Sequence, residues 1–209
     1  MTINYVIQAE VVDIKADSPT ATEAFFVDTN VWYWMTYPNA ATGAFPSQLS
    51  DYPAFVNRAL AAGARICYSG LSLAELSHLI EKTEREIYEK SVGLIRAKEY
   101  RHNLPSERSR VASEVQAAWG QVKSLSSPLA LTVDEKTTDA ALDRFRTEML
   151  DGYDLFILEA MKTHGMVQII TDDGDFATVA GIRVFTANRN VLLAARTQGK
   201  LLPRINNAP

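Results

Sequence analysis

The sequence predicts an α/β protein built around a parallel β-sheet that is covered by helices on both faces. The main observation is that short apolar segments, typical of buried strands, alternate along the chain with segments of helical periodicity. The five predicted strands are residues 24–28, 65–68, 129–133, 167–171 and 182–185. A length of 209 residues with 47% apolar residues suits one globular domain that carries additions.

The first addition is an N-terminal extension, residues 1–23. Within it, apolar side chains recur often enough over residues 3–14 to suggest one more strand at an edge of the sheet. The second addition is a helical insertion within the domain, residues 77–126. It is predicted from a stripe of apolar residues that starts near Ser72 and from the break at Pro105.

The predicted helices lie between the strands. The first helix starts near residue 30, and another is capped by Asp134. The remaining predicted helices span residues 53–62, about 72–102, about 106–124 and 154–164. Residues 38–53 carry Gly43 and three prolines, so a long loop is predicted there.

Charge and composition limit the functional class. A formal net charge of −4 argues against strong, indiscriminate binding to nucleic acid. After Asp175, however, the chain contains no further Asp or Glu, and its basic residues there are Arg183, Arg189, Arg196, Lys200 and Arg204. These residues form either a solvated tail or a surface that contacts the phosphates of RNA.

The single cysteine, Cys67, excludes an internal disulfide, fits a reducing compartment and is predicted to be a core residue. No secretory signal and no apolar run near the roughly 20 residues needed to span a bilayer are apparent. A cytoplasmic protein without membrane association is therefore expected. The glycine-containing segments match neither a Walker A loop nor a dinucleotide fingerprint, so no nucleotide cofactor is expected.

Four acidic residues stand where a parallel sheet would gather them. Asp28 ends the first predicted strand, Asp173 follows the fourth, and Glu75 and Asp154 lie at the starts of predicted helices. The carboxyl ends of parallel strands share one edge, where ligand crevices form. Carboxylates gathered there would repel one another, and a divalent cation is their natural partner. The pattern predicts a metal-dependent enzyme.

Each acid also has a structural interpretation. Ser72 and Glu75 fit a capping box, and Asp28, Asp154 and Asp173 could each stabilise a helix N-terminus. These roles explain the acids singly, but they do not explain why four of them converge on one edge.

An aromatic cluster, Trp32, Tyr33, Trp34 and Tyr37, follows Asp28. It fits core packing of the first helix, stacking on bases of a single-stranded substrate, or an interface with a protein partner.

Four segments, residues 26–31, 73–76, 153–160 and 170–176, together resemble a PIN-domain ribonuclease in order and spacing. The resemblance runs from about residue 24 to 186 and weakens across the insertion. It implies a three-layer α/β/α sandwich around a five-stranded parallel sheet. It also implies hydrolysis of phosphodiester bonds, usually in RNA, with one or two Mg²⁺ or Mn²⁺ ions.

Carried over position by position, the resemblance makes Asp28, Glu75, Asp154 and Asp173 the catalytic, metal-binding quartet. Asp175 takes a further acidic position and is a candidate for a second ion. Three polar residues are expected to support the ligands or the substrate: Asn30, Ser72 and Thr171.

The leading functional prediction is thus a metal-dependent endoribonuclease. A toxin of the VapC type, with an antitoxin partner and a homodimeric state, is one subtype, and an RNA maturation or turnover nuclease is another. A non-cleaving RNA-binding module stays open. A haloacid-dehalogenase-like phosphatase fits less well, because that family needs an Asp where this chain has Asn30.

Overall fold

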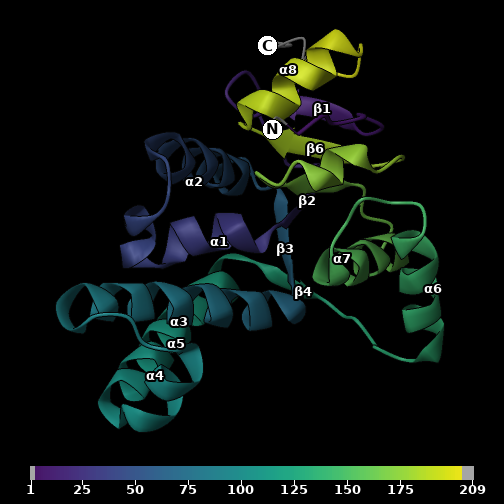
Figure 1. The fold of residues 1–209 in the computed structure, drawn as a ribbon. Helices are drawn as coiled ribbons and strands as arrows, with labels where there is room; N and C mark the ends of the chain where they lie inside the picture. The colour runs from purple at the N-terminus through teal and green to yellow at the C-terminus, as the bar shows by residue number, and fades with distance from the viewer. Residues whose placement is uncertain (1–2, 204–209) are drawn as a thin grey trace.

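The structure, a computed structural model, describes residues 3–203, in which a six-stranded sheet lies between layers of helices (Figure 1). All strand pairs are parallel, in the order β1-β6-β5-β2-β3-β4. The strands are β1 (Glu10–Asp13), β2 (Ala24–Val27), β3 (Arg65–Ser69), β4 (Ser127–Leu129), β5 (Gln168–Ile170) and β6 (Arg183–Thr186). The predicted α/β/α fold class is confirmed.

The sheet has six strands rather than the five predicted, because the N-terminal extension supplies β1. Glu10–Asp13 pairs in parallel with Arg183–Thr186 and forms one edge of the sheet. The other edge, β4, comprises residues 127–129 and so starts earlier than the predicted 129–133. Pro128 obscured this strand in the sequence, but an edge strand can accept proline because one side of its backbone needs no partner.

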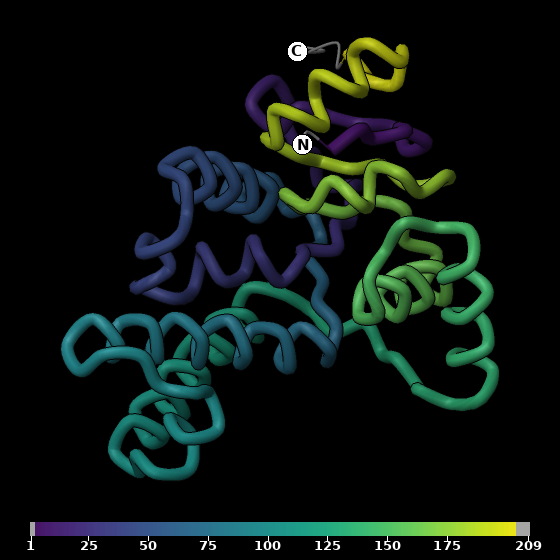
Figure 2. Tube along the Cα trace, in the orientation of Figure 1, coloured from purple at the N-terminus to yellow at the C-terminus, as the bar shows by residue number. Residues whose placement is uncertain are grey.

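The helices account for most of the remaining chain (Figure 2). They are α1 (Thr29–Thr36), α2 (Pro46–Ala61), α3 (Leu71–Val92), α4 (Ala97–Asn103), α5 (Pro105–Leu125), α6 (Glu135–Phe145), α7 (Gly152–Thr163) and α8 (Arg189–Thr197), with 3-10 turns η1 (Pro38–Thr42) and η2 (Asp175–Thr178). None of the helices in residues 3–203 is both long and apolar enough to cross a membrane.

Two helix predictions were wrong. Residues 38–53 are not a long loop, since they contain η1 and the first half of α2. Pro46 is the first residue of that helix, where a missing N–H costs nothing. Helix α3 ends at Val92 instead of near residue 102, because Gly93 adopts a φ of 94° that favours glycine. Helix α8 had no sequence prediction.

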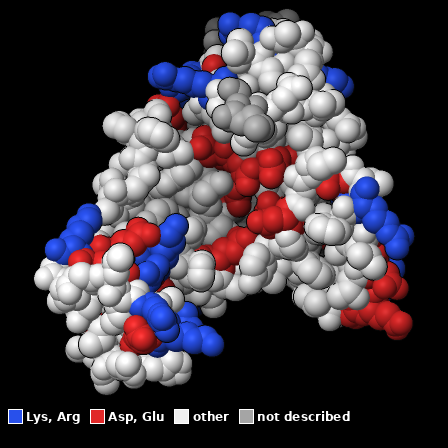
Figure 3. All heavy atoms as spheres, viewed as in Figure 1, with Lys and Arg blue, Asp and Glu red and all other residues white. Residues whose placement is uncertain are grey.

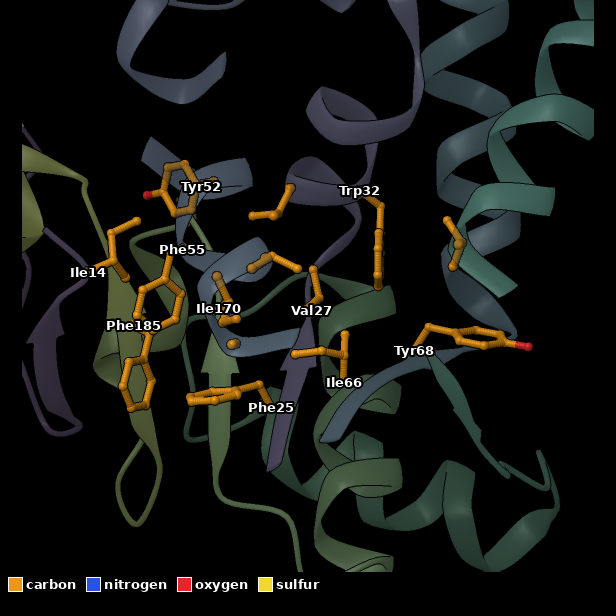
Figure 4. Close-up of a cluster of buried hydrophobic side chains, with 14 of the residues drawn as sticks. Ile14, Phe25, Val27, Trp32, Tyr52, Phe55, Ile66, Tyr68, Ile170 and Phe185 are labelled. Carbon is orange, nitrogen blue, oxygen red and sulfur yellow. The ribbon is translucent and has the colours of Figure 1, made fainter. Parts of the chain in front are cut away.

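Alternate residues of each central strand face opposite layers. In β2, Phe25 and Val27 enter one core cluster with residues of α1, α2, α3 and α5, while Phe26 enters another with residues of α6 and α7. Figure 4 shows the first cluster, in which the rings of Phe25 and Phe185 pack edge to face with centroids 4.9 Å apart. Burying both faces explains why the strands read as continuous apolar runs.

The chain changes direction across the sheet next to β2. From β2 it moves through β3 to β4 on one side, whereas β5, β6 and β1 lie on the other side. In open α/β sheets, a crevice forms outside the carboxyl ends of the strands at such a switch point. Asp28 follows β2 directly, and Thr171 follows β5 directly.

Candidate active site

A cleft of about 960 Å³ opens at this switch point, and all four acids of the predicted quartet line it. Asp28 comes from the end of β2, Glu75 from α3, Asp154 from α7 and Asp173 from the segment after β5. Figure 3 shows acidic side chains gathered in a central hollow of the molecule. Four segments that are distant in sequence therefore present carboxylates to one space.

Asp28 is the most constrained of these acids. Its side chain caps α1, where Oδ1 accepts a hydrogen bond of 2.6 Å from the Thr29 amide. Its Oδ2 accepts one of 2.5 Å from the Thr171 hydroxyl. With 5% of its surface exposed, the residue is held from both sides of the switch point. The predicted N-cap and the predicted cleft position are both present.

Thr171 links Asp28 to Asp173. Its Oγ1 donates to Asp28 and accepts a 2.8 Å hydrogen bond from the Asp173 amide. Asp173 Oδ1 in turn accepts from the Asp175 amide at 2.9 Å. Asp175 is not one of the residues that line the cleft, although it supports the backbone next to it.

Glu75 lies in the second turn of α3 and accepts a hydrogen bond from the Thr29 hydroxyl. The capping-box interpretation of Ser72 and Glu75 is wrong, because the N-cap of α3 is Gly70, and the amide of Leu71, the first helical residue, donates to the Ser69 hydroxyl at 3.2 Å. Ser72 is inside the helix, and its hydroxyl is buried without a hydrogen-bond partner. Glu75 is thereby free to face the cleft.

Asp154 is 7% exposed in the first turn of α7. The N-cap of that helix is Asp151, whose Oδ1 accepts from the Tyr153 amide at 3.1 Å and the Asp154 amide at 3.4 Å. Sequence reasoning missed Asp151, which also lines the cleft. An Asp-Gly pair just before a helical segment was the signal that could have found it.

Burial and mutual repulsion make the carboxylates hard to ionise. Burial, with further repulsion from Glu75 and Asp173, raises the pKa of Asp28 to about 7 despite its stabilising hydrogen bond from Thr171. Burial, followed by repulsion from Asp28, Asp151, Asp173 and Glu75, raises the pKa of Asp154 to about 9. The pKa values of Glu75, Asp173 and Asp175 are raised too, in each case chiefly by burial.

These residues fit a hard divalent cation. The cluster consists of oxygen donors, and a cation would offset the repulsion that raises their pKa values. Asn30 also lines the cleft, and its Oδ1 is buried without a hydrogen-bond partner. Within residues 3–203, no three His, Cys, Asp or Glu side chains form a ready-made metal-binding group. An ion here would therefore share its coordination with water, as Mg²⁺ commonly does.

The cleft continues from the acids onto α4 and α5, in the segment predicted to be a helical insertion, which sequence reasoning did not connect with the site. Its wall there includes Arg101 of α4 together with Arg108 and Trp119 of α5. Both arginines form ion pairs with Glu81 of α3, and the distance from Arg108 to Glu81 is 3.2 Å. The side chain of Arg101 is 39% exposed and that of Arg108 is 53% exposed. The two arginines flank Pro105, and only the tertiary packing of the insertion brings them to the cleft.

The aromatic cluster after Asp28 belongs to the core. Trp32 and Tyr37 are buried, and Tyr33 and Trp34 pack against the same cluster. The hydroxyl groups of Tyr33 and Tyr37 bond to Thr83 and Glu84 of α3. Of the three interpretations, packing of α1 against its neighbours is the one that these contacts support.

The basic residues near the C-terminus that the structure describes lie away from the cleft. Arg183 begins β6, so it lies at the amino ends of the strands and not at the carboxyl ends that carry the acids, and it pairs with Glu10 at 2.6 Å. Arg189 and Arg196 lie on α8, and Lys200 follows it. None of these four lines the cleft, and Arg204 lies outside the described residues. Cys67 is a buried core residue in β3.

Comparison with known proteins agrees with this geometry. The family model described as PIN domain matches residues 25–182, which include the whole predicted quartet and the insertion. Searches of curated proteins and of solved structures found no match. PIN domains are generally metal-dependent nucleases, which fits a cleft of clustered carboxylates. Because this match covers well over half of the 209-residue chain, the chain belongs to the PIN domain family.

Proposed function

We propose that this protein is a metal-dependent endoribonuclease that hydrolyses RNA phosphodiester bonds with Mg²⁺ or Mn²⁺. One observation supports it above all: Asp28, Glu75, Asp154 and Asp173, from four separate segments, line one cleft. The PIN family match supports the same reaction class. A complete acidic set is more easily explained by catalysis than by RNA binding without cleavage, since buried carboxylates would repel an RNA phosphate unless a cation offset them.

The quartet would hold the one or two ions, with Asp28 and Asp154 as direct ligands and Glu75 and Asp173 as direct or water-mediated ones. When bound, such an ion acidifies water for attack on phosphorus and offsets charge on the phosphate oxygens. The protein's own part is orientation. The Thr171 hydroxyl and the Thr29 amide fix the two oxygens of Asp28, and the Thr29 hydroxyl fixes Glu75. Asn30 Oδ1, which has no hydrogen-bond partner among residues 3–203, is placed to accept from a water, and the amide nitrogen of the same side chain can donate to a phosphate oxygen.

We further propose that the RNA strand runs from the acids onto the helical insertion. Glu75 and Glu81 are six residues apart on α3, or about 9 Å along the helix axis at 1.5 Å per residue. Arg101 and Arg108, which pair with Glu81, line the same cleft beyond the acids, where they can hold a neighbouring phosphate of the strand. Trp119 adds an aromatic surface for a base. The hollow in Figure 3 is open on this face, so a strand could cross it without threading an end.

Replacing Arg108 with alanine should weaken RNA binding with little effect on the chemical step. We expect KM to rise about 5- to 10-fold with kcat within about twofold, because a partly exposed phosphate contact contributes about 1 kcal/mol. The slope of the logarithm of RNA affinity against the logarithm of salt concentration should become shallower by roughly one, because one fewer phosphate is neutralised. Arg146→Ala is the matched control, because Arg146 is an exposed arginine paired with Asp143 and does not line the cleft. Equal KM values for the two variants would remove Arg108 from the RNA path.

A panel of substrates tests the proposed function directly. The purified protein is incubated with end-labelled single-stranded RNA, single-stranded DNA and a small phosphate monoester, with Mn²⁺, with Mg²⁺ or with EDTA. We expect internal cleavage of RNA in both metals and none in EDTA. Binding of RNA without cleavage in either metal would favour the non-cleaving module, and phosphate release from the monoester would favour a phosphatase.

The VapC-type toxin is the finer version of this function, and a maturation or turnover nuclease is its alternative. A toxin should arrest the growth of bacterial cells when it is expressed alone, and growth should recover when an antitoxin protein that inhibits it is expressed as well. Exposed apolar side chains at Leu142, Phe145 and Met149, on and just after α6, support a protein contact, for which we propose a homodimer. Light scattering during size-exclusion chromatography gives the oligomeric state.

A further inference from the structure

The N-terminal extension does more than add a strand. Residues 5–9, called the N-terminal strap below, cross from α8 to η2 before β1 begins. The side chain of Gln198, which follows α8, bonds the Tyr5 carbonyl at 2.8 Å and the Ile7 amide at 2.9 Å. The amides of Gln8 and Ala9 both donate to the Ala177 carbonyl of η2, at 3.0 and 3.1 Å. The strap is therefore tied at both ends.

Tyr5 reaches from the strap to Gly174. A Cβ built on Gly174 would lie 2.3 Å from Tyr5 Cζ and 2.4 Å from its hydroxyl oxygen, closer than real atoms approach. The φ of Gly174 is −73°, a value that any residue adopts, so glycine is needed here for space and not for conformation. The phenol ring thus lies directly against the backbone at Gly174.

Gly174 joins Asp173 to Asp175, and this short segment carries part of the acidic site. The Asp173 amide is bonded to Thr171 Oγ1, and the Asp175 amide to Asp173 Oδ1. Asp172 is turned away and receives hydrogen bonds from Tyr52 and Gln48 of α2. Burial, with nearby Asp175, Asp173 and Asp172, raises the pKa of Tyr5. Tyr5 therefore lies close to these carboxylates while being anchored on a different element.

We infer that Tyr5 is a positioning residue that presses on Gly174 and so fixes the carboxylate of Asp173 in the cleft. This role rests on the proposed function, because it concerns the same acids. It assigns the N-terminal strap, which lies before residues 25–182 matched by the family, to support of the active site. The ring atom Cζ is closest to Gly174 and the hydroxyl oxygen is next, so we expect the ring without its hydroxyl to keep most of the contact.

Two readouts test this role, and one of them does not depend on metal. In Tyr5→Ala, hydrogen exchange of the Asp173 and Asp175 amides should become about 10-fold faster, and the affinity for Mn²⁺ measured by calorimetry should fall about 10-fold. Tyr5→Phe keeps the ring and should restore both to within about twofold. Val6→Ala is the matched control, because Val6 is 64% exposed in the same strap. The thermal midpoint of each variant shows whether the fold is retained.

Gly174→Ala provides a second variant that leaves the strap sequence intact. The added methyl group meets Tyr5 first, so this change alone should weaken Mn²⁺ binding about as much as Tyr5→Ala does. In the double variant the methyl group has the space left by the ring, and the two losses should not add.

Three results would overturn the inference. They are unchanged amide exchange in Tyr5→Ala, faster exchange with unchanged Mn²⁺ affinity, and fully additive losses in the double variant. If the wild type bound no Mn²⁺ at all, the proposed function would fail, while the exchange comparison would still decide whether Tyr5 fixes this segment.

Discussion

Asp28→Asn should reduce RNA cleavage by about 1,000-fold or more while leaving the fold intact. Asp28 is the acid held most firmly in the cleft, by the Thr29 amide and the Thr171 hydroxyl. Losing a metal-binding carboxylate removes several kcal/mol of stabilisation of the transition state, and each 1.36 kcal/mol is a tenfold change in rate. Single-turnover cleavage of labelled RNA with saturating Mg²⁺ measures the effect.

The substitution is close to isosteric, and its amide oxygen can still accept from Thr29. Because the carboxylate is buried and repelled by Glu75 and Asp173, the neutral amide should not lower the thermal midpoint of the metal-free protein at pH 8. The matched control is Asp143→Asn, which changes an exposed aspartate that pairs with Arg146 on the surface. If Asp28→Asn retained the wild-type rate in a folded protein, the acids described above would not be the catalytic site.

Divalent metal should stabilise the protein strongly at pH 8 and only weakly at pH 5.5. At a concentration of about 100 times its Kd, a bound ion contributes about 2.7 kcal/mol, which corresponds to a rise of about 5–10 °C in the thermal midpoint of a protein of this size. At pH 5.5 protons compete for the same carboxylates, so we expect less than half of that rise. Thermal unfolding with Mn²⁺ or Mg²⁺ and with EDTA measures both values.

The metal-free protein should show the opposite trend with pH. The folded-state pKa values of Asp28 and Asp154, about 7 and about 9, lie above the ordinary value near 4. The folded state therefore holds protons that the unfolded chain releases, and stability falls as the pH rises from about 4 through these values. Glu81, whose pKa is lowered by Arg101, contributes in the other direction, but mostly below pH 5. Asp28→Asn should flatten the slope between pH 5.5 and pH 8, and an equally steep slope in that variant would refute the assignment.

Local sequence patterns were sufficient to predict the fold class and to predict that four acids gather at one edge of the sheet. Strands buried on both faces produce short apolar runs, and these runs marked β2, β3, β5 and β6 to within one or two residues. Asp28 follows β2 directly and Asp173 lies three residues after the end of β5, so a parallel sheet alone brings them to one edge. Such features depend on neighbours in the chain, which is why they could be predicted from the sequence.

Residues defined by contacts between distant segments could not be found in this way. The hydrogen bond from Thr29 to Glu75 joins residues 46 positions apart, and that from Thr171 to Asp28 joins residues 143 apart. Because the N-cap of α3 is Gly70 and Glu75 bonds to Thr29, Ser72 and Glu75 do not form a capping box. Ser72 is a buried serine, and Glu75 is a carboxylate that lines the cleft. Residues 38–53 were predicted to be a loop because of their prolines and Gly43, but Pro46 is the first residue of α2. The start of β4 was predicted too late, because proline is tolerated in an edge strand, as at Pro128.

A parallel α/β sheet and an acidic edge follow from the amino-acid sequence alone, because apolar periodicity and the order of strand ends are local properties of the chain. The sequence suggested a further edge strand in the N-terminal extension, but its parallel pairing with β6 and the position of Tyr5 against Gly174 are visible only in the folded protein. Only the tertiary structure decided that Arg101 and Arg108 line the same cleft as the acids. These arrangements arise from packing between segments tens to more than a hundred residues apart, and no periodicity within a segment encodes which surfaces will meet.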